Sequence, residues 1–136
     1  LFRQKITGRE TMFSHVMVGT NDLEKSKKFY DAVLGTLGVK PAMVDGHRMF
    51  YRTKTGVFGV TAPINGQPAT IANGATIGFA CETPEQANAW HEAGLANGGT
   101  AIENPPGIRQ GATMELYLAY LRDPDGNKIC AMKRMG

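Results

Sequence analysis

Two segments of the chain alternate apolar residues with smaller or polar ones, and they span 14–18 and 75–81. In the first segment Val16 and Val18 share one face and His15 lies on the other. A period of two residues places successive side chains on opposite faces of a sheet. Each segment is therefore predicted to be a strand with one buried face.

Helical patterns follow both predicted strands. The first helix is expected to begin after an N-cap at Asn21 or Asp22, whose side chains accept hydrogen bonds from the first helical turn. Thr83 is the expected N-cap of the second helix, ahead of a proline at the first helical position. Gly38 and the glycine pair at 98–99 are expected to end the two helices, because glycine tolerates the left-handed conformation common there.

Three further strands are predicted after each helix, bounded by turn-forming residues. Asp45-Gly46 is a hairpin signal in the first half, and D-P-D-G at 123–126 is a turn in the second. The Pro- and Gly-rich stretches are predicted to be a linker at 63–74 and a loop at 104–113. The six strands are expected at 39–44, 47–53, 56–62, 100–103, 115–122 and 127–133.

The two halves of the chain match one another at an offset of 61 residues. The matches fall on strand positions, apolar helix positions and a glycine, and they are Val16 with Ile77, Val18 with Phe79, Phe29 with Trp90, Ala32 with Ala93, Leu34 with Leu95, and Gly38 with Gly99. The predicted fold class is therefore α+β, with two tandem β-α-β-β-β modules over 12–62 and 75–134.

The composition is that of an ordinary globular domain, predicted over 12–134. Hydrophobic residues make up 42% of the chain and charged residues 20%. No apolar run approaches the roughly 20 residues that a membrane-spanning helix needs, so no membrane partner is expected. Cys81 and Cys130 are too few for a disulfide scaffold, which favours a reduced, cytoplasmic compartment.

Most of the formal net charge of +3 comes from one end of the chain. Residues 1–11 contribute +2, from Arg3, Lys5 and Arg9 against Glu10, which leaves +1 for the rest. We interpret 1–11 as a tag remnant or a flexible extension. Elsewhere lysine and arginine alternate with aspartate and glutamate, so no nucleic-acid partner is predicted.

Three motifs resemble those of the vicinal oxygen chelate superfamily, which includes glyoxalase I, extradiol dioxygenases and the fosfomycin- and bleomycin-resistance proteins. They are H-V-x-V at 15–18, N-D-L-E-K-S-x-x-F-Y at 21–30 and D-P-D-G-N-K-I at 123–129. The resemblance runs from Met12 to Arg134. It implies that the two modules pair their sheets into an incomplete barrel around a cleft, and that the protein forms a homodimer.

The metal-dependent members of that superfamily place His, Glu, His and Glu on the first and last strands of the two modules. Carried over, these positions fall on His15, near Gly59, on Thr76 and on Cys130. Only the first ligand is retained, whereas a catalytic divalent metal requires about three protein ligands and an open position. We therefore predict no metal cofactor. A metal held through His15 is the alternative.

Six residues are predicted to contact a small-molecule ligand in the cleft: His15, Thr61, Thr76, Arg109, Tyr120 and Cys130. His15 is the candidate catalytic residue, as a base or a residual ligand, and the competing interpretation is a hydrogen-bonded structural histidine. Tyr120 would form an aromatic wall. Arg109 would bind a carboxylate or phosphate, or else be a solvated surface charge. Cys130 is equally consistent with a small buried apolar side chain.

These residues are compatible with two functions. The first is a metal-free protein that binds a small molecule in the cleft, as bleomycin-resistance proteins do. The second is a lyase or isomerase related to glyoxalase that uses His15. The missing ligands favour the first.

Overall fold

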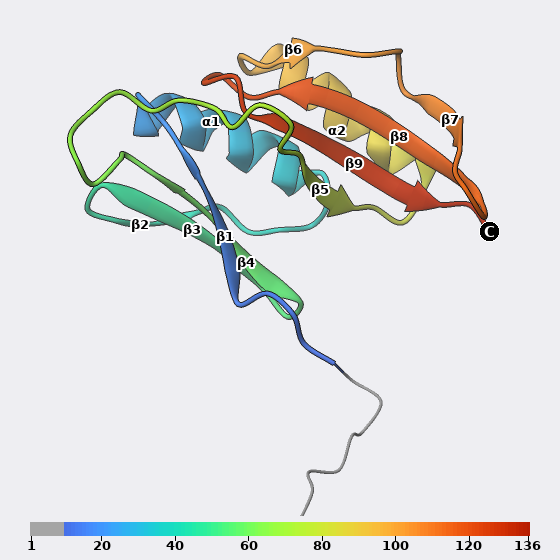
Figure 1. The fold of residues 1–136 in the computed structure, drawn as a ribbon, viewed down its shortest axis with the longest axis horizontal. Helices are drawn as coiled ribbons and strands as arrows, with labels where there is room; N and C mark the ends of the chain where they lie inside the picture. Colours follow the sequence, from blue (N-terminus) through green and yellow to red (C-terminus); the bar gives the residue numbers. More distant parts are fainter. Residues whose placement is uncertain (1–9) are drawn as a thin grey trace, which may run out of the picture.

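The computed structural model describes residues 10–136, and residues 1–9 lie outside the described part. Most of the predicted extension 1–11 therefore falls outside it. The first module forms a four-stranded sheet, sheet A, with one helix (Figure 1). Its elements are β1 (His15–Gly19), α1 (Leu23–Gly35), β2 (Met43–Asp45), β3 (Arg48–Thr53) and β4 (Gly56–Thr61).

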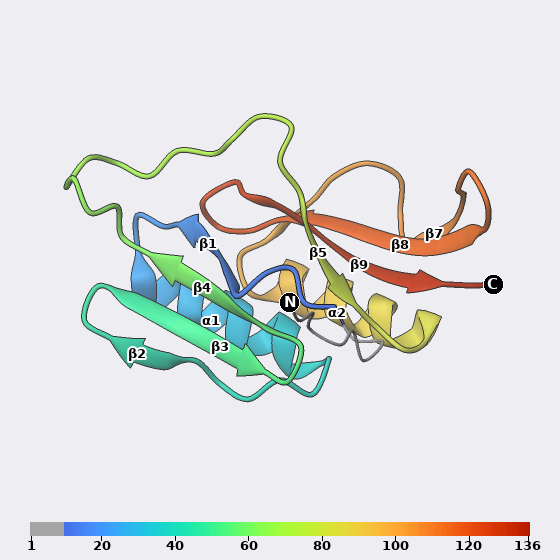
Figure 2. The same ribbon diagram turned by 60° about the horizontal axis from the view of Figure 1, so that its bottom comes forward.

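The second module forms a five-stranded sheet, sheet B, with the second helix. Its elements are β5 (Ile77–Ala80), α2 (Pro84–Ala96), β6 (Thr100–Ala101), β7 (Gly107–Gln110), β8 (Glu115–Arg122) and β9 (Lys128–Arg134). Figure 2 shows the linker between the modules running from the end of sheet A to β5 without crossing the strands of sheet A. No helix among residues 10–136 is long and apolar enough to cross a membrane.

The two sheets have the same order of equivalent strands. Sheet A runs β1-β4-β3-β2 and sheet B runs β5-β9-β8-β6, with β7 pairing on β8. The first strand of each module lies parallel to its last strand, and the other pairings are antiparallel. The predicted α+β fold of β-α-β-β-β modules is confirmed, and the sheets do not close into a barrel.

Three elements differ from the sequence prediction. The stretch 104–113, predicted to be a loop, contains β7, a short strand whose flanking prolines and glycines hide its alternation. The strand expected at 75–81 is shorter and excludes Thr76. The strand expected at 39–44 begins only at Met43. Short edge strands depend on pairing with a neighbour more than on their own sequence.

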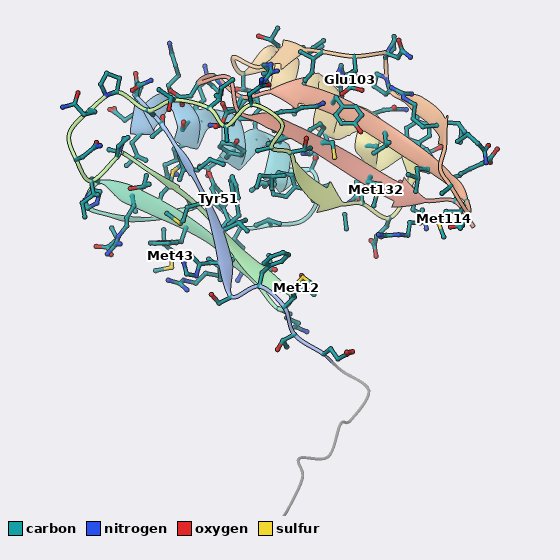
Figure 3. All side chains as sticks on the ribbon, viewed as in Figure 1. Met12, Met43, Tyr51, Glu103, Met114 and Met132 are labelled. Carbon is teal, nitrogen blue, oxygen red and sulfur yellow. The ribbon has the colours of Figure 1, made fainter. Side chains whose placement is uncertain are left out.

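Both helices pack on one face of the sheets, and the core lies between. Val16 and Val18 of β1 face this core, as their alternation predicts. Tyr51 also points from β3 toward α1, where its hydroxyl donates to Asp31 at 2.8 Å (Figure 3). Trp90 of α2 is fully buried. The face of each sheet that points away from the helices is called its open face below.

The D-P-D-G-N turn between β8 and β9 joins the two modules through buried polar contacts. Asp123 is 3% exposed and accepts the Tyr30 hydroxyl of α1 at 2.6 Å and the Asn127 side chain at 2.9 Å. Asn127 also donates to the carbonyl of Gly19 at 3.1 Å. The carboxylate therefore ties the last hairpin of module 2 to the first helix of module 1.

Asp125 extends the same connection to the start of α1. Its carboxylate accepts the hydroxyls of Thr20 at 2.6 Å and Ser26 at 3.1 Å, and the backbone N–H of Asn21 at 2.8 Å. The two motifs that carried the family resemblance, on the first helix and in the last turn, are therefore bonded to each other. These hydrogen bonds fix how the two modules pack against each other.

Candidate ligand-binding site

A cavity of about 480 Å³ lies between the two modules. Its volume falls in the range of roughly 300–1,000 Å³ typical of small-molecule sites. Its wall is mainly apolar and comes from β1, α1, β3, β4 and β5. The principal apolar residues of the wall are Val16, Leu34, Leu37, Val39, Val57, Phe58, Ile77 and Phe79.

A smaller cavity of about 190 Å³ lies at the corresponding place on the other side of the module junction. Residues 17–19 of β1 line the smaller cavity, and their counterparts 78–80 of β5 line the larger one. Residues 70–72 of the linker form part of the wall of the smaller cavity.

The turns that border the two cavities explain why one is larger. Asn127, at the smaller cavity, belongs to the D-P-D-G-N turn that bonds across to module 1. The counterpart turn of module 1, T-K-T-G at 53–56, borders the larger cavity. Within residues 10–136, Thr53 makes its side-chain hydrogen bonds only inside this turn, with Thr55 and with the carbonyl of Gly56. Module 1 therefore has no turn that seals the junction, and the space remains open.

His15 lies at the rim of the larger cavity. It is exposed, and its Nδ1 shares a hydrogen bond of 2.7 Å with the Ser14 hydroxyl. Phe13 lines the same rim with 69% of its surface exposed. His15 is the one residue of the predicted ligand-binding set that lines this cavity, and it supplies hydrogen-bonding capacity beside an apolar wall.

The space beside Gly59, where the resemblance would place the first carboxylate ligand, is occupied by a neighbouring side chain. A Cβ atom at Gly59 would lie 2.2 Å from the sulfur of Met17 and 3.1 Å from the ring of Phe50. Met17 is the direct partner of Gly59 in the β1–β4 pair. The thioether therefore fills the space into which a ligand at position 59 would project.

On sheet B the structure brings Tyr120 and Cys130 together, as direct partners on the open face. Burial raises the pKa of the Cys130 thiol to about 11, against the opposing effect of Lys128. The Lys128 ammonium lies 5.0 Å from the centre of the Tyr120 ring and forms an ion pair with Glu103. The pKa of the Tyr120 hydroxyl is also raised, mainly by burial. Cys130 is 6% exposed and lines neither cavity, so it has the surroundings of a small buried apolar side chain.

The remaining predicted residues lie on other elements, although the positive charge of Arg109, on the neighbouring strand β7, acts to lower the pKa of the Tyr120 hydroxyl. The guanidinium of Arg109 donates to the carbonyls of Asn104 and Pro105 at 3.0 and 3.1 Å, in the loop that precedes β7. Thr61 lies on the open face of sheet A and donates to the carbonyl of Ala62 at 2.8 Å. Thr76 is exposed and precedes β5. The ligand-binding roles of these three residues stay predictions.

The residues at the positions where the resemblance would place metal ligands do not fit a divalent metal. They offer one imidazole, a glycine covered by a thioether, an exposed hydroxyl and a single buried thiol. Across residues 10–136, no three His, Cys, Asp or Glu side chains gather closely enough to hold a metal ion. Metal sites need about three such donors, and hydroxyl and thioether groups are poor substitutes for carboxylate.

Two features near the site were not predicted from the sequence. Phe50 and Arg52 lie on the open face of sheet A. The alternation of residues along β3 would have been enough to predict this orientation. His91 of α2 is only 8% exposed. Burial lowers its pKa, with a backbone hydrogen bond to Tyr120 acting in the opposite sense. It is a structural histidine behind sheet B.

Comparison with known proteins agrees with this geometry. A solved glyoxalase/bleomycin resistance protein from Albidiferax ferrireducens T118 is 67% identical, with a TM-score of 0.88 over 90% of this chain and 98% of that one. A glyoxalase-related enzyme from Fulvimarina pelagi is 19% identical, with a TM-score of 0.69 over 89% and 86% of the two chains. A lactoylglutathione lyase from Agrobacterium tumefaciens is 17% identical, with a TM-score of 0.62 over 90% and 93%.

The last two likenesses show the fold alone. Comparison with curated protein sequences found no match. A family model, however, matches residues 12–131, which is most of the chain and includes both modules. The protein therefore belongs to the Glyoxalase/Bleomycin resistance protein/Dioxygenase superfamily.

Proposed function

We propose that this protein binds a small organic molecule between its two modules without the help of a metal ion. The observation that carries the proposal is the cavity of about 480 Å³, with an apolar wall and with His15 at its rim. An apolar wall with a few polar groups is the usual form of a small-molecule site. His15 would donate or accept a hydrogen bond at the polar end of the ligand.

The chemistry of the inherited ligand positions supports binding over metal-dependent turnover. Glyoxalase-type catalysis would need carboxylate donors at positions 59 and 130, where this chain has a glycine covered by a thioether and a buried cysteine. No further observation favours a lyase or isomerase, because the likeness to the Agrobacterium enzyme is limited to the fold. Binding is therefore the function that these residues support best.

A homodimer is part of the same proposal. The edge strand β2 exposes Met43 and Val44 by 68% and 55%, and Ile108 of β7 is 48% exposed. Figure 3 shows Met43 on sheet A and Met132 on sheet B, side chains that a second copy would cover. Exposed apolar strands at a sheet edge favour pairing between chains. Light scattering coupled to size-exclusion chromatography measures the mass directly, and a monomer would contradict this part.

We also propose a reducing, cytoplasmic compartment, since both cysteines are free thiols.

The binding proposal is tested with a neutral apolar probe, N-phenyl-1-naphthylamine, whose fluorescence rises in an apolar site. We expect saturable binding that Gly56→Leu reduces at least about tenfold, because a Cβ at Gly56 meets no atom within 4 Å and would enter the cavity that this residue lines. Gly35→Leu is the matched control, since Gly35 also has free space but lies on α1 outside the cavity.

Equal binding by wild type and Gly56→Leu would contradict the proposal. Elemental analysis of the purified protein tests its metal-free aspect. A stoichiometric divalent metal that disappears in His15→Ala would establish the alternative, a metal site using His15.

A further inference from the structure

Strand β3 carries two arginines on either side of an aromatic ring, on the open face of sheet A. Arg48, Phe50 and Arg52 alternate with the buried Met49 and Tyr51. Arg48, Phe50 and Arg52 are together called the arginine patch below. The guanidinium carbons of Arg48 and Arg52 lie 5.8 and 5.1 Å from the centre of the Phe50 ring. Both cations therefore gather around one apolar platform.

The positive charge of the arginine patch is poorly compensated. Arg48 has one acidic neighbour, Asp45, at 3.8 Å, and the two side chains are 48% and 72% exposed. Exposed pairs of this kind contribute little, since water screens them. Arg52 forms no ion pair with any acidic residue of the described chain, 10–136. Two like charges around one ring repel each other, and an anion between them would relieve that repulsion.

The acidic residues of the protein are concentrated elsewhere. Those on the two helices and their caps lie behind the sheets, and they are Asp22, Glu24, Asp31, Glu85 and Glu92. Asp45 is the acidic side chain on the open face of sheet A within residues 15–61. The open face of sheet A is therefore the side of module 1 that attracts an anion.

The arginine patch is continuous with the cavity. Val57 is the direct partner of Arg52 in one strand pair and of His15 in the other. The three side chains therefore form one row across the open face, with strands about 4.8 Å apart. Val57 and His15 both line the cavity. A ligand with its apolar part in the cavity can thus extend along this row to the guanidinium of Arg52.

We infer that the ligand of this site is an organic anion, an apolar molecule with a carboxylate, phosphate or sulfonate group that Arg52 binds, with Arg48 as the second contact. This inference rests on the proposed binding function and names the class of its ligand. Arginine suits the role because its planar guanidinium binds oxyanions through two hydrogen bonds. Phe50 keeps the guanidinium near the ring and offers a flat surface to the ligand.

The test compares two probes of similar shape, the anion 8-anilino-1-naphthalenesulfonate and the neutral N-phenyl-1-naphthylamine. We expect Arg52→Gln to raise the dissociation constant of the anion about tenfold and to leave that of the neutral probe within about twofold. Arg48→Gln should act in the same direction with a smaller effect, because Asp45 already engages Arg48. Added NaCl should weaken binding of the anion only.

Lys25→Gln, which removes an exposed positive charge on α1, is the matched control and should change neither constant. Circular dichroism checks that each variant is folded. Equal effects of Arg52→Gln on both probes, or no effect on the anion, would overturn the inference while the binding function stands. Failure of the neutral probe to bind the wild type would refute the proposed function, and the effect of Arg52→Gln on the anion would still report on the arginine patch.

Discussion

The junction between the two modules has a cavity on each of its two sides, and a different turn borders each cavity. D-P-D-G-N, at 123–127, sends two carboxylates and an amide into the other module, where they meet partners from α1 and the end of β1. T-K-T-G, at 53–56, bonds within itself and leaves a larger, apolar space. Two modules with the same strand order thus have one junction sealed by polar contacts and one open to a ligand.

The largest effect is expected at the sealed junction, from Asp123→Ala. The substitution leaves the buried Tyr30 hydroxyl, the Asn127 amide and two backbone N–H groups without their acceptor. Loss of a buried charged partner costs about 3 kcal/mol or more in the free energy of unfolding. Urea denaturation measures it. Thr55→Ala in the counterpart turn is the control and should change stability by less than about 0.5 kcal/mol.

If the two substitutions had equal effects, the difference between the junctions would not lie in these turns. The cavity would then need another explanation.

A smaller effect that depends on pH is expected from Tyr30→Phe. Burial, and next the charge and hydrogen bond of Asp123, hold the pKa of Tyr30 well above its usual value. A raised pKa means that the neutral hydroxyl stabilises the folded state fully below the usual tyrosine pKa of about 10. That contribution is lost as pH rises through the folded-state value.

Wild type should therefore exceed Tyr30→Phe in unfolding free energy by a constant amount, about 1–2 kcal/mol, from pH 7 to about 10. The difference should shrink above that range. Unfolding curves in urea at a series of pH values measure it, and a difference that grew with alkaline pH would contradict the role assigned to the Tyr30–Asp123 bond.

The smallest effect concerns a sulfur–glycine pair that occurs in each module with the roles exchanged. In module 1 the sulfur is on the first strand, Met17 beside Gly59, and in module 2 it is on the last strand, Cys130 beside Gly78. A Cβ would lie 2.2 Å from the sulfur at Gly59 but 3.3 Å at Gly78. Gly59→Ala should therefore destabilise more than Gly78→Ala, by about 1 kcal/mol, since crowding in a packed site costs roughly this much.

Introducing Gly59→Ala into a protein that already carries Met17→Ala tests whether crowding against the Met17 sulfur causes the loss of stability. Removal of the thioether should abolish most of the penalty of Gly59→Ala in a double-mutant cycle, measured by thermal or urea unfolding. An unchanged penalty would show that Met17 does not fill the space at position 59.

The fold could be predicted from the sequence wherever a pattern was long and local. The alternation of Val16 and Val18, and Thr83 as an N-cap that accepts from Gln86 at 3.0 Å, are present as expected. The short strand β7 was not predictable, because its alternation covers only four residues and its order comes from pairing with β8. Local rules set helices and long strands, whereas edge strands depend on distant partners.

The candidate site was predictable only in part, for the same reason. His15 could be placed on the open face from alternation alone, and Tyr120 and Cys130 share a face as expected. That Thr61, Thr76 and Arg109 do not line the cavity beside His15 could not be read from the chain, because strand register and module packing decide which residues line it.

By itself the sequence determined the order of the main elements and the faces of the longer strands, since each depends on residue type and local spacing. Only the tertiary structure decided that Met17 occupies the space beside Gly59, that Asp123 and Asp125 bond to the first helix, and that one junction stays open. Those outcomes depend on contacts between segments up to about a hundred residues apart, which no local pattern encodes.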